Sequence, residues 1–375
     1  MGSSINENEC WSWFCDEIEI GSCNGNFDLR LVPYSGAGAS YDSLARLPAR
    51  NSHGFEGRPP LAKQLFNPGF GPYIGQFPQA HGLITDLEKE DSDVEALLEK
   101  FQRDAETDYP RGRVQITAIR YYLQTMLLGC LANWETVTFG VTNYNPLLYQ
   151  IDHRVQGDKI LVSFNYDTLL EEALLATVGV KIEKPSDYLG SEYKVIKLHG
   201  SINWAHKVML PTIDLNRGQS QVASELIERT SELMVNDSFE VIPKHVIATY
   251  RGQPIAMLGD KPAIPALSIP VANKSVYECP LDHRQAMLDC LPEVNKILVV
   301  GWRGTENRFL DDLTHYVNPK VKIMVVSSSE RSAGDVINRI QGRMRVAGRQ
   351  ADYIAAKGDF SNAIQNHEIE GFLRQ

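Results

Sequence analysis

The chain contains the run Leu31-Val32-Pro33-Tyr34-Ser35-Gly36-Ala37-Gly38-Ala39-Ser40, an apolar, strand-like segment that ends in a turn of small residues. Residues without bulky side chains let a backbone lie close to a ligand, and amides at a helix start point toward it. The turn therefore suits a pyrophosphate. The full pattern Gly-x-Gly-x-x-Gly would need glycine at position 41, where this chain has Tyr41. A tight strand-to-helix turn that binds nothing stays an alternative.

Composition limits the classes of function. A chain of 375 residues, 43% of them hydrophobic, can form one large domain or two ordinary ones. The net charge of -10 leaves no overall basic surface for nucleic acid, so we predict no direct nucleic-acid binding. The sequence contains no apolar run of roughly 18 to 20 residues and no signal-peptide pattern. We therefore predict a soluble cytoplasmic protein without membrane association.

The cysteines do not have the spacing of a metal site. No Cys-x-x-Cys occurs in the chain, and structural zinc usually needs such closely spaced ligand pairs. We predict reduced thiols and no structural metal. The six residues are Cys10, Cys15, Cys23, Cys130, Cys279 and Cys290.

Hydrophobic patterns predict alternating strands and helices. Short aliphatic runs predict strands at 29–35, 160–165, 193–198, 297–301, 321–326 and 353–356, and a further strand at 245–250. Helical spacing predicts helices at 41–46, 61–66, 145–155, 168–177, 223–234 and 360–372, and apolar stripes predict two more around 94–101 and 116–131. Ser40 is expected to cap the first helix, and Thr168 with Glu171 forms a capping box for the helix at 168–177.

These elements predict an α/β fold: a Rossmann-like parallel sheet flanked by helices, with a helical insertion and a smaller cap subdomain. We assign 1–28 to an N-terminal extension and 29–375 to the Rossmann domain, which contains a loop and helical insertion at 48–159 and a cap at 205–290. The part at 48–79 is dense in proline and glycine and is predicted to be a mostly irregular lid. Its aromatic residues Phe55, Phe66, Phe70 and Tyr73 are expected to close over a ligand.

Polar residues follow several of the predicted strands. Asn165 and Asp167 come after the strand at 160–165, and His199 follows the strand at 193–198. Parallel sheets bind ligands at the carboxyl ends of their strands, so these side chains are candidate site residues. Asn can orient a water, because its amide offers both a donor and an acceptor, and His titrates near neutral pH. A purely structural role for either residue stays an alternative.

Four motifs together resemble the sirtuin-like superfamily. They are GAGAS at 36–40, SFNYDTLLEEAL at 163–174, KLHGSINW at 197–204 and VVGWRGTENRFLDDL at 299–313. The match is closest to the bacterial sirtuin-like domains of antiphage defence, where Asn-Tyr-Asp and Lys-Leu-His-Gly-Ser are characteristic.

The resemblance implies a role for each matching position. Gly36, Ala37, Gly38 and Ser40 would hold the NAD pyrophosphate, Asn165 and Asp167 would line the nicotinamide-ribose pocket, and His199 would act as general base. Gly301 and Thr305 would contact the adenosine ribose, and Ser327 would touch the adenosine. Asn165, His199 and Asp167 are thus the candidate catalytic residues, and NAD is the expected substrate.

Two departures from the pattern of protein-deacylating sirtuins favour water as the acceptor of the ADP-ribosyl group. Protein-deacylating sirtuins carry Gly-Ile-Pro-Asp-Phe-Arg after the glycine turn and two Cys-x-x-Cys pairs after the histidine, and this chain has neither. We therefore expect hydrolysis of NAD to nicotinamide and ADP-ribose, as an antiphage defence effector. The alternatives are a protein deacylase, an ADP-ribosyltransferase, and a non-catalytic NAD or ADP-ribose sensor. The resemblance also implies a homo-oligomer and a protein partner such as a helicase-type ATPase or an Argonaute.

Overall fold

The computed structural model describes residues 31–43, 58–87, 93–106, 110–214, 216–271 and 277–375. Six parallel strands form the main sheet, in the order β10-β9-β8-β1-β2-β3. This confirms the predicted Rossmann-like α/β class. The strands are β1 (Leu31–Ser35), β2 (Lys159–Ser163), β3 (Tyr193–Lys197), β8 (Lys296–Val300), β9 (Lys322–Val326) and β10 (Asp352–Ala355).

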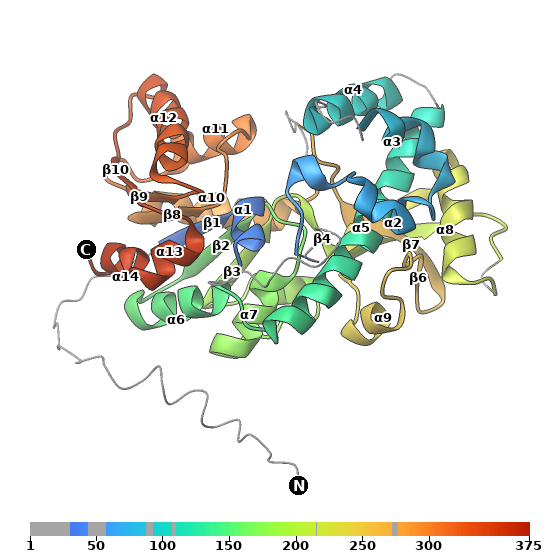
Figure 1. Ribbon diagram of the computed structural model, residues 1–375, viewed down its shortest axis with the longest axis horizontal. Helices are drawn as coiled ribbons and strands as arrows, with labels where there is room; N and C mark the ends of the chain where they lie inside the picture. The colour runs from blue at the N-terminus through green and yellow to red at the C-terminus, as the bar shows by residue number, and fades with distance from the viewer. Residues whose placement is uncertain (1–30, 44–57, 88–92, 107–109, 215, 272–276) are drawn as a thin grey trace, which may run out of the picture.

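Successive side chains of a strand point to opposite faces, so the aliphatic strands of the main sheet have apolar side chains on both faces. Helices cover both of these faces. In β8, Ile297 and Val299 pack in one hydrophobic cluster, whereas Leu298 and Val300 pack in the other. The first cluster is covered by α10 (Leu281–Cys290), α11 (Asn307–Tyr316) and α12 (Glu330–Val346). The second is covered by α6 (Tyr144–Arg154), α7 (Leu169–Val178), α13 (Phe360–Gln365) and α14 (Glu368–Arg374). Figure 1 shows these two groups of helices on opposite sides of the sheet.

The strand order reverses its direction between β1 and β8. From β1 the chain adds β2 and then β3 on one side, and later returns to place β8, β9 and β10 on the other. Open α/β sheets bind ligands outside the carboxyl ends of their strands at such a switch point. The turns that follow β1 and β8 therefore mark the expected crevice.

A second, antiparallel sheet lies beside the first in the order β5-β4-β7-β6 (Figure 1). Its strands are β4 (Gly200–Met209), β5 (Met234–Val241), β6 (Met257–Leu258) and β7 (Lys261–Leu267). The long helix α5 (Pro110–Thr138) packs on it: Tyr121 donates a hydrogen bond to the Ala263 carbonyl at 2.6 Å, and Gln124 to the Ile202 carbonyl at 2.9 Å. This unit confirms the predicted smaller subdomain as a feature of the fold, while the domain borders given above stay predictions.

Other helices are shorter and lie in both parts of the molecule. They are α2 (Gly71–Ile74), α3 (His81–Leu87), α4 (Val94–Glu106), α8 (Gln219–Glu228) and α9 (Lys244–Thr249), with 3₁₀ helices at Ala62–Gln64, Pro68–Phe70, Pro78–Ala80, Pro185–Tyr188, Thr230–Glu232 and Leu291–Glu293. The predicted strand at 245–250 is therefore wrong. Pro243 precedes α9 and gives the chain the extended turn from which a helix starts.

Two predicted helix caps are also wrong. The first helix, α1 (Ala37–Tyr41), begins after Gly36, so Ser40 lies inside the helix and does not cap it. Thr168 precedes α7 without a capping hydrogen bond, because its hydroxyl donates instead to Glu172 at 2.7 Å. At the other end of the chain, the predicted helix 360–372 breaks at His367, whose φ of +57° separates α13 from α14.

The described part of the predicted lid packs against the protein core and does not cover the strand ends. Phe66 and Phe70 are each only 2% exposed, and Phe66 stacks on Tyr122 of α5 with ring centroids 5.4 Å apart. Tyr73 is partly buried against the same core. Phe55 lies outside the described residues. The aromatic residues bury apolar area against α5, which explains why the segment folds into short helices.

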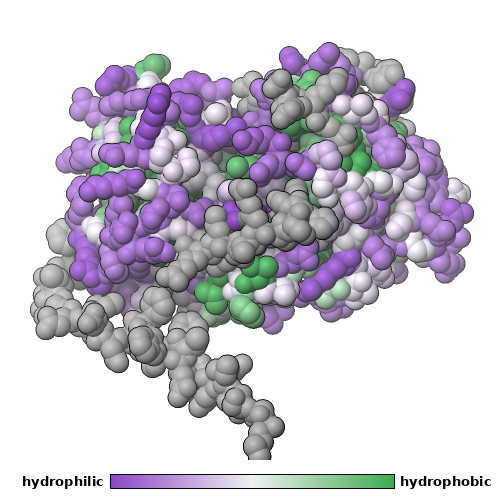
Figure 2. Space-filling view, in the orientation of Figure 1, coloured by the Kyte–Doolittle hydropathy of each residue, from purple (hydrophilic) through white to green (hydrophobic). Residues whose placement is uncertain are grey.

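The surface in Figure 2 is mainly hydrophilic. The three most exposed large hydrophobic side chains of the described residues lie far apart in the chain: Phe139 in the turn after α5, Leu281 in α10 and Val346 in α12. No helix in the described ranges is long and apolar enough to cross a bilayer.

Candidate functional site

The turns after β1 and β8 contact each other through their backbones. Gly36 N donates to the Val300 carbonyl at 2.9 Å, and Gly38 N donates to the Gly301 carbonyl at 3.1 Å. A Cβ on Gly36 would lie 2.6 Å from the Gly301 oxygen, and one on Gly38 would lie 2.9 Å from the Gly301 Cα. The glycines are therefore required by the contact between the two turns, a reason that the sequence pattern alone did not reveal.

Substituting Gly301 should destabilise the protein. Its φ is +62°, and a Cβ there would lie 2.2 Å from the Ala39 nitrogen, so Gly301→Ala should lower the free energy of unfolding by roughly 2 kcal/mol or more. Gly334 of α12 is the matched control, since a Cβ there meets nothing within 4 Å. Thermal unfolding of both variants measures the difference. Equal melting temperatures for Gly301→Ala and the wild type would contradict the close contact.

Ser40, Tyr144 and Asn165 form a buried polar cluster at the carboxyl edge of the main sheet. Asn165 Nδ2 donates to Ser40 Oγ at 2.7 Å and to the Tyr144 hydroxyl at 3.2 Å, and the two hydroxyl oxygens lie 3.1 Å apart. Asn165 Oδ1 is buried and accepts no hydrogen bond from the described residues. A buried acceptor without a protein partner is costly, so Asn165 Oδ1 is available to accept a hydrogen bond from a ligand or water.

Asp167 lies beside this cluster and also starts a helix. Its Oδ1 accepts a hydrogen bond from Leu169 N at 3.1 Å, so it satisfies the first turn of α7 in place of Thr168. Burial raises the pKa of Asp167, while Lys197 and Ser40 oppose that shift. The carboxylate is thus used by the fold, which supports a structural role for Asp167 alongside any contact with a ligand.

His199 lies where the chain passes from the main sheet to the antiparallel sheet. The residue is 5% exposed, and its ring packs against Phe164, with centroids 5.5 Å apart, and more distantly against Tyr166 and Tyr277. Phe164 directly precedes Asn165, so the same segment supports both candidate residues.

Gly200 explains the glycine that follows the histidine. Its φ is +76°, and a Cβ would lie 2.2 Å from the Ala266 carbonyl oxygen of β7. Ser268 N also donates to the His199 carbonyl at 2.9 Å. The His-Gly pair therefore joins the two sheets and holds the imidazole at their junction.

The structure adds Glu306, a residue that the sequence analysis did not select. Its Oε1 lies 3.9 Å from His199 Nε2, and its Oε2 accepts a hydrogen bond from Trp302 Nε1. Glu306 belongs to the turn after β8, within the motif at 299–313. A search for an acidic residue at the end of each predicted strand could have found it. Tyr144 carried no such signal, because it begins a helix far from the motifs.

A buried ion pair supports the loop that carries Asp167. Lys197 Nζ lies 2.9 Å from Glu171 Oε1, with side chains 0% and 8% exposed, and also donates to the Asp167 carbonyl. Tyr188 donates to Glu171 at 3.3 Å and accepts from Trp204 Nε1 at 2.8 Å. The pair thereby links β3 and α7 of the main sheet to β4 of the second sheet.

The other selected residues lie farther from this group. Ala37 and Thr305 are exposed on the turns after β1 and β8, and Thr305 Oγ1 reaches Glu306 Oε2 at 3.5 Å. Ser327 follows β9, which β8 separates from β1. The structure thus brings Ser40, Asn165 and Asp167 together, places His199 nearby, and spreads the residues assigned to adenosine along the same edge of the sheet.

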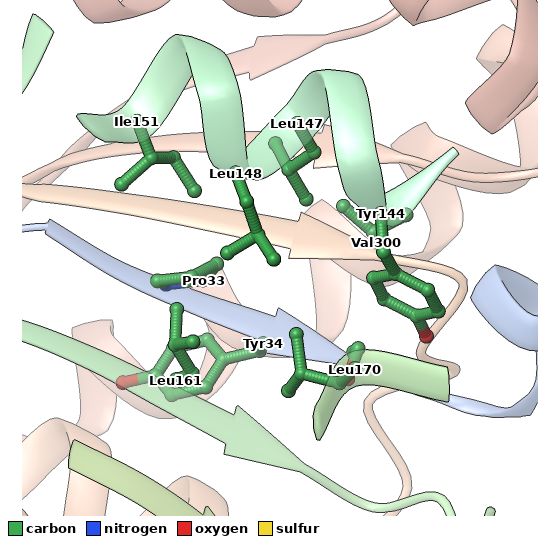
Figure 3. A pocket seen from close by; sticks show the side chains of 10 residues that line it. Pro33, Tyr34, Tyr144, Leu147, Leu148, Ile151, Leu161, Leu170 and Val300 are labelled. Atoms are coloured by element: carbon green, nitrogen blue, oxygen red, sulfur yellow. The ribbon is translucent and has the colours of Figure 1, made fainter. Parts of the chain in front are cut away.

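An apolar hollow lies next to the polar cluster, between α6 and strands β1 and β2 (Figure 3). Leu147, Leu148 and Ile151 line it from α6, and the Tyr144 oxygen points away from them toward the strand ends. This hollow offers few polar groups and does not suit a pyrophosphate. Within the described ranges, no three His, Cys, Asp or Glu side chains are grouped to hold a metal ion. Because Cys10, Cys15 and Cys23 lie outside those ranges, the absence of a structural metal stays a prediction.

No protein-family model and no curated protein matches the chain. Similar solved structures are Sir2 proteins. A Sir2 homologue in complex with NAD is 14% identical, with 92% of this chain and 89% of that chain covered and a TM-score of 0.37. Sir2 with a p53 peptide and NAD+ is 11% identical, with 92% and 94% covered and a TM-score of 0.38. Sequence identities and TM-scores this low do not establish a shared function.

Proposed function

We propose that this protein binds NAD at the carboxyl edge of the main sheet and hydrolyses it to nicotinamide and ADP-ribose. The main support for this proposal is the buried hydrogen bond between Asn165 and Ser40 beside the switch point of the sheet. In this cluster Asn165 Oδ1 can still accept a hydrogen bond from a ligand or water. His199 on the neighbouring strand end supplies a group that can take a proton. The motif resemblance supports the choice of NAD.

The proposed reaction needs few groups. The bond between the nicotinamide nitrogen and the ribose carbon breaks, nicotinamide leaves as a neutral molecule, and a water oxygen bonds to that carbon. The proton that the water loses passes to His199. Positioning of the water by Asn165 and proton transfer by His199 match these steps, and such general-base help contributes about 10²- to 10⁴-fold.

A nicotinamide-release assay separates this proposal from its alternatives. Purified protein is incubated with NAD, with and without an acetylated peptide, and the products are separated by chromatography. Release of nicotinamide and free ADP-ribose without peptide supports hydrolysis. Release only with peptide favours a deacylase, and ADP-ribose attached to protein favours a transferase. Binding of NAD without any release favours a sensor.

His199→Gln should lower kcat by about 10²-fold or more, with NAD affinity nearly unchanged, because the base acts mainly in the transition state. Calorimetry gives the affinity and nicotinamide release gives kcat. His81→Gln, at an exposed position of α3, is the control and should leave both quantities unchanged. Hydrolysis at the wild-type rate in His199→Gln would exclude His199 as the base.

The broader biological proposals rest on the motif resemblance. A role in antiphage defence, a homo-oligomer, and a partner such as a helicase-type ATPase or an Argonaute stay predictions. Water as the acceptor, inferred from the departures from the sirtuin pattern, and a cytoplasmic location, inferred from the lack of a signal-peptide pattern, also stay predictions.

A further inference from the structure

We propose that Glu306 is a positioning residue for His199, orienting the imidazole and stabilising its charge when it takes the proton. This inference rests on the proposed function, in which His199 is the base. His199 Nε2 and Glu306 Oε1 are 3.9 Å apart, an ion-pair distance. The two residues come from different halves of the main sheet, since one follows β3 and the other follows β8.

The second oxygen of the Glu306 carboxylate, Oε2, is held in place by neighbouring side chains. Trp302 Nε1 donates to Oε2, and Thr305 Oγ1 lies 3.5 Å from the same oxygen. Glu306 is also the residue that precedes α11, where an acidic side chain would commonly cap the helix, yet it makes no capping hydrogen bond. The carboxylate thus faces Trp302 and His199 instead of its own helix.

The surroundings make this interaction stronger than one on the surface. The side chains of Glu306 and His199 are 20% and 6% exposed, and rings of Phe164, Tyr166 and Tyr277 pack around the imidazole. Burial raises the pKa of both tyrosines, so they are neutral near pH 7. Low exposure to water weakens screening between charges.

Other charged side chains lie near the tyrosine rings that surround the imidazole. Arg308 lies over the Tyr277 ring at 4.8 Å, and Glu95 and Arg120 influence Tyr166 from the helical insertion. Among the residues that the structure describes, Glu306 lies at ion-pair distance from the imidazole, so its removal should disfavour the protonated form of His199. An opposite charge within 4 to 6 Å favours the protonated imidazole.

The test measures the titration of His199 by NMR in protein labelled with ¹³C at the histidine imidazoles. His199→Gln identifies its signal among the nine histidines. In Glu306→Gln, which keeps an oxygen for Trp302, the midpoint should fall by about one pH unit, since the neutral amide no longer favours the imidazolium. Asp311→Asn, at an exposed site on α11, the helix that follows Glu306, should leave the midpoint unchanged.

Kinetics provide the second readout. Glu306→Gln should lower kcat for NAD hydrolysis roughly tenfold with little change in KM, and the acidic limb of the pH profile should move to lower pH. Glu306→Asp should restore part of both effects. An unchanged His199 midpoint in folded Glu306→Gln would overturn the inference. A shifted midpoint in a protein that does not hydrolyse NAD would support the pairing and reject the proposed function.

Discussion

Asn165→Ala should lower the rate of NAD hydrolysis by about 10²-fold or more while NAD still binds, because the amide that we propose to orient the attacking water is lost. The substitution removes the donor to Ser40 Oγ and Tyr144 and the buried acceptor Oδ1. The proposed binding of NAD through the turns after β1 and β8 would not depend on that amide. Calorimetry with NAD beside nicotinamide release should therefore show loss of kcat with affinity kept within a few fold.

A matched control separates catalysis from stability. Asn203 of β4 in the second sheet is also buried, and its Nδ2 lies 3.4 Å from the Tyr188 hydroxyl. Removing either buried amide should cost about 1–3 kcal/mol of stability. Asn203→Ala should nevertheless hydrolyse NAD at nearly the wild-type rate. Equal loss of activity in both variants would show that removing any buried amide impairs hydrolysis through stability. Full activity in Asn165→Ala would place the catalytic site elsewhere.

Lys197→Met should cause the largest loss of stability, about 3–5 kcal/mol, because it leaves the Glu171 carboxylate buried without its cation. The lysine also donates to the Asp167 carbonyl, so the loop that carries Asp167 loses a support. Scanning calorimetry should show a melting temperature lower by several degrees.

The double variant Lys197→Met, Glu171→Gln tests the cause of that loss. If an uncompensated charge dominates, removing it should recover a substantial part of the stability, because two neutral side chains need no ion pair. Lys181→Met, whose pair with Glu183 is exposed on both sides, is the control and should change the melting temperature little. A double variant that is less stable than Lys197→Met would contradict the electrostatic account.

The parallel sheet could be predicted because its strands are buried on both faces. Such strands appear in the sequence as continuous aliphatic runs, as in Lys296–Val300 and Lys322–Val326, and a polar or glycine residue marks the end of each. The same marks identified the strand ends that carry Asn165 and His199. Short local signals were less reliable: 245–250 became a helix after Pro243, and the hydroxyl of Thr168 bonded Glu172 instead of the backbone.

The sequence by itself determined the strands, their polar ends and the residues available for chemistry, because these depend on hydrophobic runs and local turns. Only the tertiary structure decided which distant side chains meet. Ser40 and Asn165 are 125 positions apart, and Tyr144 reaches them from a helix without a motif. Glu306 meets His199 because β8 returns beside β1, and Gly301 is required because two backbone turns touch. Such contacts depend on how the strands are ordered in space, which no local pattern records.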